Sequence, residues 1–90
     1  MNKLRTLEDM GPGEQGTIKK IDGGHGLQRR LNLLGLGIGK KVRKITSEPF
    51  RGPVVVEVDG GQIAIGRGIA RKVWVGPVDE NSSDGKPKRG

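Results

Sequence analysis

The stretch Gly26–Gly39, GLQRRLNLLGLGIG, decides the fold of this chain. Its residues Leu27, Leu31 and Leu34 recur at the i, i+4, i+7 spacing of one helical face. Gly35 then supplies the residue with which helices commonly end, and the leucine after it is placed to pack back on Leu31. We expect a short helix whose leucine face is buried, because about eight residues do not stay helical alone in water.

The opposite face of this helix carries side chains that the fold does not need. Leu33 lies about 120° from the centre of the buried face, between Arg29 and Arg30. These three residues are therefore candidate partner-binding residues. Phe50 is a fourth candidate, because the loop Pro49–Pro53 either folds it over the end of the core or displays it to a partner.

The rest of the sequence favours short strands. Seventeen glycines in 90 residues indicate tight turns at short intervals, which are typical of small barrels. We predict a mainly β, SH3-like barrel of about five strands, with the short helix inserted after the first long strand. The expected strands lie within residues 14–21, 40–46, 54–58, 62–65 and 72–75, with a single helical turn at 67–71.

Three of these strands carry specific expectations. The spacing of three between Ile18 and Ile21 predicts a bulge or bend. In residues 40–46, Val42 and Ile45 stand among four basic residues, which again predicts a bent strand with a solvated side. The turn Asp59-Gly60-Gly61-Gln62 predicts a hairpin with a two-residue loop. The expected opposite pairs are Val58 with Ile63, Val56 with Ile65 and Glu57 with Ala64.

Composition limits the organisation of the chain. Ninety residues suffice for one domain, which we place at residues 1–78. Residues 79–90 contain nothing to bury and are expected to form a disordered polar tail. Cysteine is absent, and we see neither a signal-peptide core nor a membrane-spanning apolar run. The expected location is the cytoplasm.

The sequence offers little material for catalysis or metal binding. One histidine, no cysteine, no tyrosine and scattered carboxylates do not form a catalytic set, so we predict a protein that is not an enzyme. His25 lies in a glycine-rich turn near Asp22. It is either an exposed loop residue or one ligand of a divalent transition metal. We assign no cofactor and keep His25 as the only candidate metal ligand.

A formal charge of +7 favours an acidic partner without identifying it. Nucleic acid is the alternative function, through the basic strand Lys40–Lys44. Phe50 and Trp74 are the only aromatic residues, however, and single-strand recognition usually needs several stacking rings. Nucleic acid is therefore the second choice as a partner.

The order and spacing of several motifs resemble one known family. They are residues 26–39, the turn Pro12-Gly13, the loop Pro49–Pro53, the hairpin Val58–Gly60, the pair Ala64-Ile65, and Ala70 followed by Val73 and Val75. Together they span nearly all of residues 4–76 and are similar to the ferrous iron transport protein A (FeoA) family. Two positions depart from it: Ile38 stands where proline is common, and Gly66 where a larger residue is usual.

The resemblance implies an SH3-like barrel and a bacterial cytoplasmic accessory of ferrous iron uptake. Its implied partner is the membrane ferrous iron transporter with an N-terminal GTPase domain (FeoB type), contacted without membrane insertion. A related domain occurs in metal-dependent repressors, but this sequence shows no helix-turn-helix segment. We therefore expect docking on the transporter through Arg29, Arg30, Leu33 and Phe50.

Overall fold

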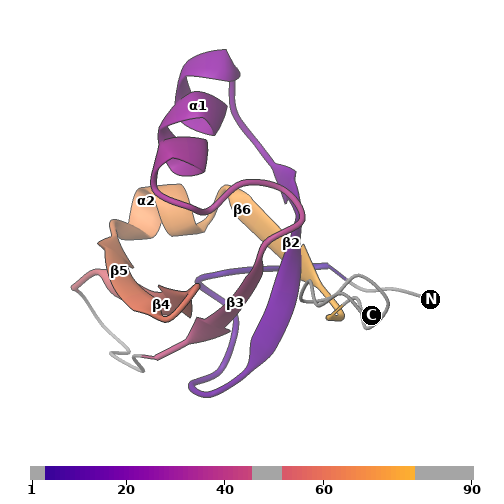
Figure 1. The fold of residues 1–90 in the computed structure, drawn as a ribbon, viewed down its shortest axis with the longest axis vertical. Coiled ribbons are helices and arrows are strands. Elements are labelled where there is room, and N and C mark those ends of the chain that lie inside the picture. Colours follow the sequence, from indigo (N-terminus) through magenta and orange to yellow (C-terminus); the bar gives the residue numbers. More distant parts are fainter. Residues whose placement is uncertain (1–3, 46–51, 79–90) are drawn as a thin grey trace, which may run out of the picture.

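The computed structural model describes residues 4–45 and 52–78 of the chain. Within these ranges the chain forms six strands and two helices, and Figure 1 shows their arrangement. The elements are β1 (Arg5–Thr6), β2 (Gln15–Ile21), α1 (His25–Leu33), β3 (Lys41–Lys44), β4 (Val54–Val58), β5 (Gly61–Ile65), α2 (Arg67–Ala70) and β6 (Val73–Gly76). Phe50 and the predicted tail at residues 79–90 lie outside the described residues.

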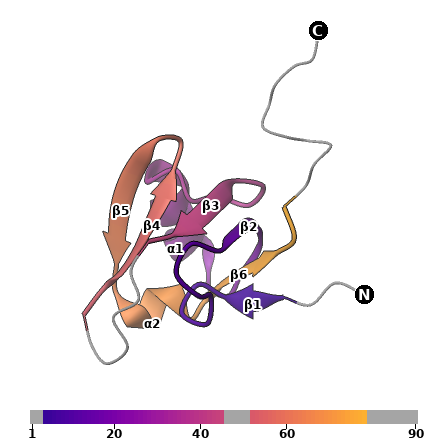
Figure 2. The same ribbon diagram turned by 90° about the horizontal axis from the view of Figure 1, so that it is seen from below.

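All six strands belong to one antiparallel sheet with the order β1-β6-β2-β3-β4-β5. Seen from below, the sheet curls around its interior, with α2 beneath it and β1 and β5 as its two edges (Figure 2). The predicted mainly β small barrel, with a helix after the first long strand, is confirmed. The sixth strand, β1, was missed because two residues are too few to show an alternating pattern.

The core fills the inside of this curled sheet. Its buried apolar residues are Leu7, Met10, Ile18, Ile21, Leu31, Leu36, Val42, Val54, Val56, Val58, Ile65, Ala70, Val73 and Val75. The pairing of β2 with β6 shifts register between Ile18 and Lys20, so the predicted bulge is confirmed. This bend lets one strand reach two neighbours, β6 and β3.

The hairpin of β4 and β5 forms, but its predicted register is wrong by two residues. Its opposite pairs are Val54 with Ile65, Val55 with Ala64, Val56 with Ile63, Glu57 with Gln62 and Val58 with Gly61. The loop is Asp59-Gly60, with φ of 52° and 83°. A type I′ turn requires positive φ at both central residues, and here Asp59 and Gly60 adopt it in place of the expected Gly-Gly centre. A shift of two residues leaves each side chain on its predicted face.

Strand β3 also differs from its prediction. It is regular, so its inward residues are Val42 and Lys44, while Ile45 lies half-buried beyond its end. A buried lysine was not expected, because lysine is almost never buried without partners.

The predicted helical turn α2 and the inward Val73 and Val75 of β6 are confirmed. Within the described residues, no helix is long and apolar enough to cross a membrane.

Candidate docking surface on helix α1

Helix α1 is fixed at its C-terminal end by backbone hydrogen bonds. Gly35 has a φ of +87°, a conformation that a residue without Cβ adopts at little cost. Its amide donates to the Asn32 carbonyl oxygen at 3.0 Å, and the Leu36 amide donates to the Leu31 carbonyl oxygen at 2.7 Å. These are the two bonds of a Schellman ending, so the predicted helix ending is confirmed.

The buried face of α1 is narrower than the sequence predicted. Leu31 and Leu36 are buried and Leu27 packs against the core, but Leu34 is 48% exposed. Leu34 is the C-cap residue, where the helix ends, and Leu36 reaches the core from just beyond it. The prediction that Leu34 belongs to the buried face is therefore wrong.

The exposed side chains at this end of α1 form what we call the α1 surface: Arg29, Arg30, Leu33, Leu34 and Ile38. Leu33 is 82% exposed and Ile38 is 60% exposed. Both arginines are exposed. Single exposed leucines are common on proteins, but several close in sequence and flanked by arginine have the composition of a protein-binding site.

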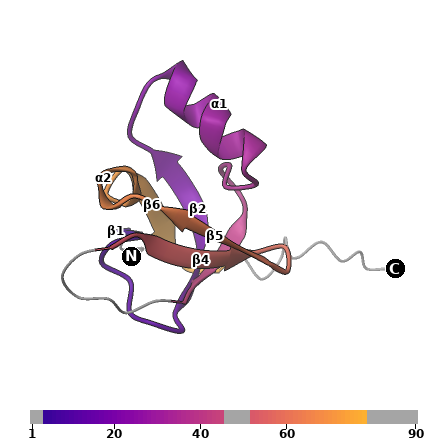
Figure 3. The same ribbon diagram turned by 90° about the vertical axis from the view of Figure 1, so that its left-hand side faces the viewer.

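The electrostatics of α1 are entirely basic. The helix contains no acidic residue. Among residues 4–45 and 52–78, neither Arg29 nor Arg30 takes part in an ion pair. Figure 3 shows α1 standing above the sheet, and both arginines are exposed to solvent. The surface can therefore attract an acidic partner without first breaking internal contacts.

Sequence reasoning found three of the five residues of the α1 surface. Arg29, Arg30 and Leu33 follow from the helical wheel, because Arg29 and Leu33 turn away from the core-facing leucines and Arg30 flanks them. Leu34 was missed because a periodic pattern does not reveal where the helix runs past the barrel. Ile38 was noted only as a departure from proline, although an isoleucine between two glycines was a signal of exposure.

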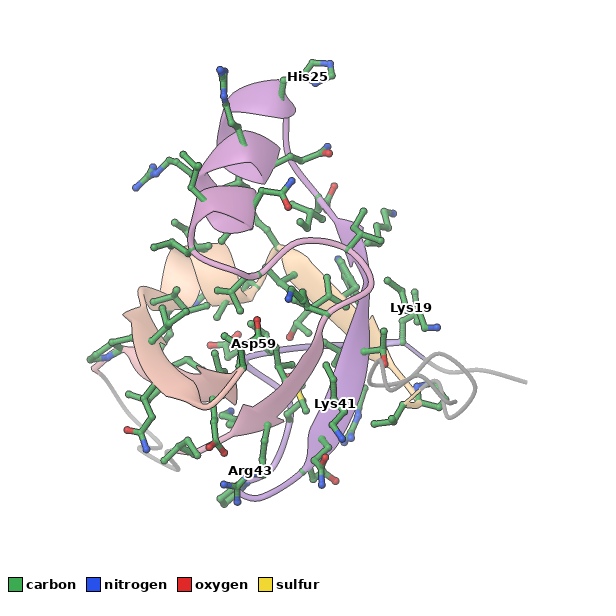
Figure 4. The ribbon with its side chains drawn as sticks, in the orientation of Figure 1. Lys19, His25, Lys41, Arg43 and Asp59 are labelled. Carbon is green, nitrogen blue, oxygen red and sulfur yellow. The ribbon has the colours of Figure 1, made fainter. Side chains whose placement is uncertain are left out.

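Most of the basic residues in Lys40–Lys44, the alternative nucleic-acid site, are engaged in contacts within the protein. Lys40 pairs with Asp59 at 2.8 Å, and Arg43 pairs with Glu57. Lys44 is buried. Lys41 is the residue of this strand that stays exposed without an ion pair among the described residues (Figure 4). Of the four basic residues in this alternative, Lys44 is therefore buried, Lys40 and Arg43 are engaged in ion pairs, and Lys41 is left exposed.

Lys44 stabilises the fold and is not available to a partner. Its ammonium group donates to the carbonyl oxygens of Glu8 at 2.8 Å and Met10 at 2.7 Å. Burial is the main cause that lowers the pKa of Lys44, and the Arg67 cation lowers it further while nearby carboxylates oppose both. The side chain thereby holds the turn after β1 against β3.

Glu8 connects the same turn to α2. Its carboxylate accepts hydrogen bonds from Arg71 Nε at 3.0 Å and Arg67 Nη1 at 3.2 Å. The hydrogen bond from Arg71 is the largest of the causes that lower the pKa of Glu8. No sequence pattern indicated this contact, because the residues that it joins are about 60 positions apart in the chain.

His25 begins α1 at the end far from the barrel, where Figure 4 shows it pointing into solvent. Among the described residues, no three His, Asp or Glu side chains lie close enough together to hold a metal ion. Metal binding through His25 is thus not supported by neighbouring ligands and stays a prediction.

A shallow pocket of about 230 Å³ lies between the ends of β1, β2 and β6. Its lining is Arg5, Gln15, Val75, Gly76 and Pro77. The one ionisable side chain among them, Arg5, is paired with Glu14 at 2.7 Å. This lining contains no nucleophile and base in contact with each other.

Comparison with known proteins agrees with this architecture. The family model described as "FeoA domain" matches residues 5–77. A protein of Methanocaldococcus jannaschii named "Putative Fe(2+) transport protein A" is 44% identical over 63 residues, which are 70% of this chain and 74% of the relative.

Solved structures give the same result. A crystal structure described as the iron uptake regulatory protein FeoA is 36% identical with a TM-score of 0.76, covering 82% of this chain and 97% of its own. The FeoA protein from Chlorobium tepidum is 25% identical with a TM-score of 0.72, covering 92% and 81%. A manganese-dependent transcriptional repressor shares the fold at 23% identity and a TM-score of 0.75, covering 86% and 43%. This chain belongs to the FeoA domain family.

Proposed function

We propose that this protein is a non-enzymatic cytoplasmic accessory of ferrous iron transport. It docks through the α1 surface on the cytoplasmic GTPase domain of the membrane iron transporter. Family membership supports the link to iron transport, because two of its relatives carry Fe(2+) transport or iron uptake in their names. The exposed apolar and cationic side chains of α1 support the docking step.

The observation that carries the proposal is the exposure of Leu33. A side chain that is 82% exposed contributes almost nothing to folding, yet it lies between two arginines that have no ion pair among the described residues. Arginine is over-represented among the residues that dominate binding energy at protein interfaces, and an apolar side chain gains free energy when a partner covers it and removes it from water. Leu33 is thus the expected centre of the contact, with Arg29 and Arg30 beside it.

An amide titration tests where the partner binds. The ¹⁵N-labelled protein is titrated with the soluble GTPase domain of the transporter at low and high salt. We expect the largest shifts within residues 29–39, and weaker binding at high salt because arginines contribute.

Shifts confined to β2 and β3 would instead place the partner on the basic strand and contradict docking through α1. The absence of any shift at the highest GTPase concentration would contradict the choice of partner.

A further inference from the structure

The free edge of the sheet at β5 is a feature that the α1 surface does not explain. Natural proteins usually blunt such edges with lysine, proline, a bulge or a very short strand. The other edge, β1, is two residues long and includes Arg5. Strand β5 pairs with β4 over five consecutive residues without a register shift, and its sequence GQIAI contains no charge and no proline.

The backbone groups on this edge can be identified from the register. The Ile45 amide donates to the Val55 carbonyl oxygen at 2.8 Å, so the backbone of Val55 faces β3. Val55 lies opposite Ala64 in the β4–β5 pair. Ala64 therefore belongs to a non-hydrogen-bonded pair, and its N–H and C=O point to the free edge. Gln62 lies two residues earlier and presents its backbone in the same direction.

These outward groups are accessible. Gln62 and Ala64 are both exposed. In the described ranges, residues 62–65 make no backbone hydrogen bond beyond those of the β4–β5 pair. The inward side chains Ile63 and Ile65 pack on the core and hold the strand in place. The edge is thus a rigid template with two unpaired backbone positions.

Helix α1, which lies near the hairpin, is cationic. The C-terminal end of α1 lies near the β4–β5 hairpin, because a Cβ placed on Gly35 would lie 4.0 Å from Val58 Cγ1. Val58 is the β4 residue opposite Gly61 of β5. Figure 3 shows α1 above the β4–β5 hairpin. That helix carries Arg29 and Arg30 and no acid.

We propose that β5 binds an extended acidic segment of a partner protein by strand addition. The segment pairs with the backbone of Gln62 and Ala64 and becomes a seventh strand, as peptides do at exposed sheet edges. Its carboxylates are attracted by the arginines of α1. A second copy of this chain fits less well, because two chains of charge +7 repel each other. The site shares the two arginines of α1 with the α1 surface but needs no contact with Leu33.

A peptide titration tests the proposal without the transporter. The probe is a capped heptapeptide of alternating valine and glutamate, and the same peptide with lysine for glutamate is its control. We expect the glutamate peptide to shift the amides of Gln62 and Ala64 and to slow their hydrogen exchange. The lysine peptide is expected to bind at least about tenfold more weakly because of repulsion.

Two variants at one position separate backbone pairing from side-chain contact. Ala64→Pro removes the outward N–H while leaving the bonds to β4, a position where proline is tolerated. We expect it to weaken binding about tenfold or more, whereas Ala64→Val, which keeps the N–H, retains it. Ala64→Glu keeps the fold and repels the peptide, so it is expected to weaken binding as well. Leu33→Ala, which removes the apolar side chain of the α1 surface without changing its charge, is expected to change peptide affinity less than about twofold, because Leu33 is not part of this edge.

Several results would overturn the proposal. The first two are equal binding of the glutamate and lysine peptides, and peptide binding by Ala64→Pro that is as tight as binding by Ala64→Val. The third is the absence of any shift of the β5 amides at millimolar peptide. The fourth is a concentration-dependent dimer of the protein that Ala64→Pro abolishes. The last result would assign the edge to a second copy of the chain.

Discussion

Lys44 places a charged group inside a small domain, and it is stable there because two backbone carbonyl oxygens accept its hydrogen bonds. Hydrogen bonds to a charged group are stronger than neutral ones and contribute about 1.5–3 kcal/mol. The lysine thus fixes the chain that connects β1 to β2 onto the inner side of β3.

We predict that Lys44→Ala lowers the free energy of unfolding by about 2–4 kcal/mol, because it leaves two carbonyl groups unsatisfied and opens a cavity. Urea denaturation measures the change. The matched control is Lys41→Ala, an exposed lysine on the same strand, which should change stability by less than about 0.5 kcal/mol. Equal stability of the two variants would contradict the role assigned to Lys44.

The residue scale is also where sequence reasoning failed most. The sequence pattern predicts that Lys44 is exposed and Leu34 buried, whereas Lys44 is buried and Leu34 is exposed. In each case, contacts between distant parts of the chain determine the burial. The neighbours that satisfy Lys44, at Glu8 and Met10, are more than 30 positions away in the chain. The exposure of Leu34 depends on where the helix ends relative to the sheet, which periodicity does not contain.

At the scale of elements, α1 depends on two glycines with opposite effects. Gly35 ends the helix with a positive φ that other residues adopt only under strain. Gly26 lies in the first turn, where a Cβ would meet no atom within 4 Å, and a glycine there costs helix stability. The C-terminal end of the helix is therefore well capped. Its N-terminal end is weakly stabilised, since the N-cap residue Gly24 has no side chain that could accept a hydrogen bond.

Alanine substitutions at these two glycines should have opposite signs. Gly35→Ala is expected to destabilise the protein by about 1–2 kcal/mol, because the new side chain is forced into the left-handed region. Gly26→Ala is expected to stabilise it by about 0.5–1 kcal/mol, because alanine favours the helix. Thermal unfolding monitored by circular dichroism measures both, and destabilisation by Gly26→Ala would contradict the open environment described for this position.

The element scale shows what the sequence can specify well. The leucine spacing and Gly35 predicted α1 and its ending, and alternating valines predicted β4. The hairpin loop was misplaced because both Asp-Gly and Gly-Gly suit a two-residue loop, and the choice depends on which residues adopt positive φ. The prediction of which side chains of β4 and β5 face the core was unaffected, because a register shift of two residues leaves every side chain on the same face of the sheet.

At the scale of the whole molecule, Glu8 joins the N-terminal turn to α2 and so helps to hold the curled sheet together. Its two arginine partners come from the segment between β5 and β6. The other edge, at β5, has no comparable contact among the described residues. Within the described residues, the turn after β1 is therefore tied to α2 by ion pairs, whereas no other strand pairs with the outer edge of β5.

The arginine contacts of Glu8 predict how stability depends on pH. The folded pKa of Glu8 lies below its ordinary value of 4.5, so the unfolded chain binds more protons in this range. Stability is fully present above about pH 4.5 and is lost as the pH falls through the lower folded pKa. Glu8→Gln should flatten this acid dependence, as measured by urea denaturation between pH 3 and 6, approximately the range of glutamate titration. An unchanged pH profile would contradict the contact.

The central claim, that α1 is the docking element, is tested most directly by the affinity for the transporter's GTPase domain. Calorimetry should compare wild type with Leu33→Asp and with Lys41→Gln, which changes the net charge equally but lies on β3. We predict that Leu33→Asp weakens binding at least about tenfold, because it places a carboxylate at the centre of an apolar contact, and that Lys41→Gln stays within about twofold of wild type. Equal affinities for wild type and Leu33→Asp, or a larger loss in Lys41→Gln, would contradict the claim.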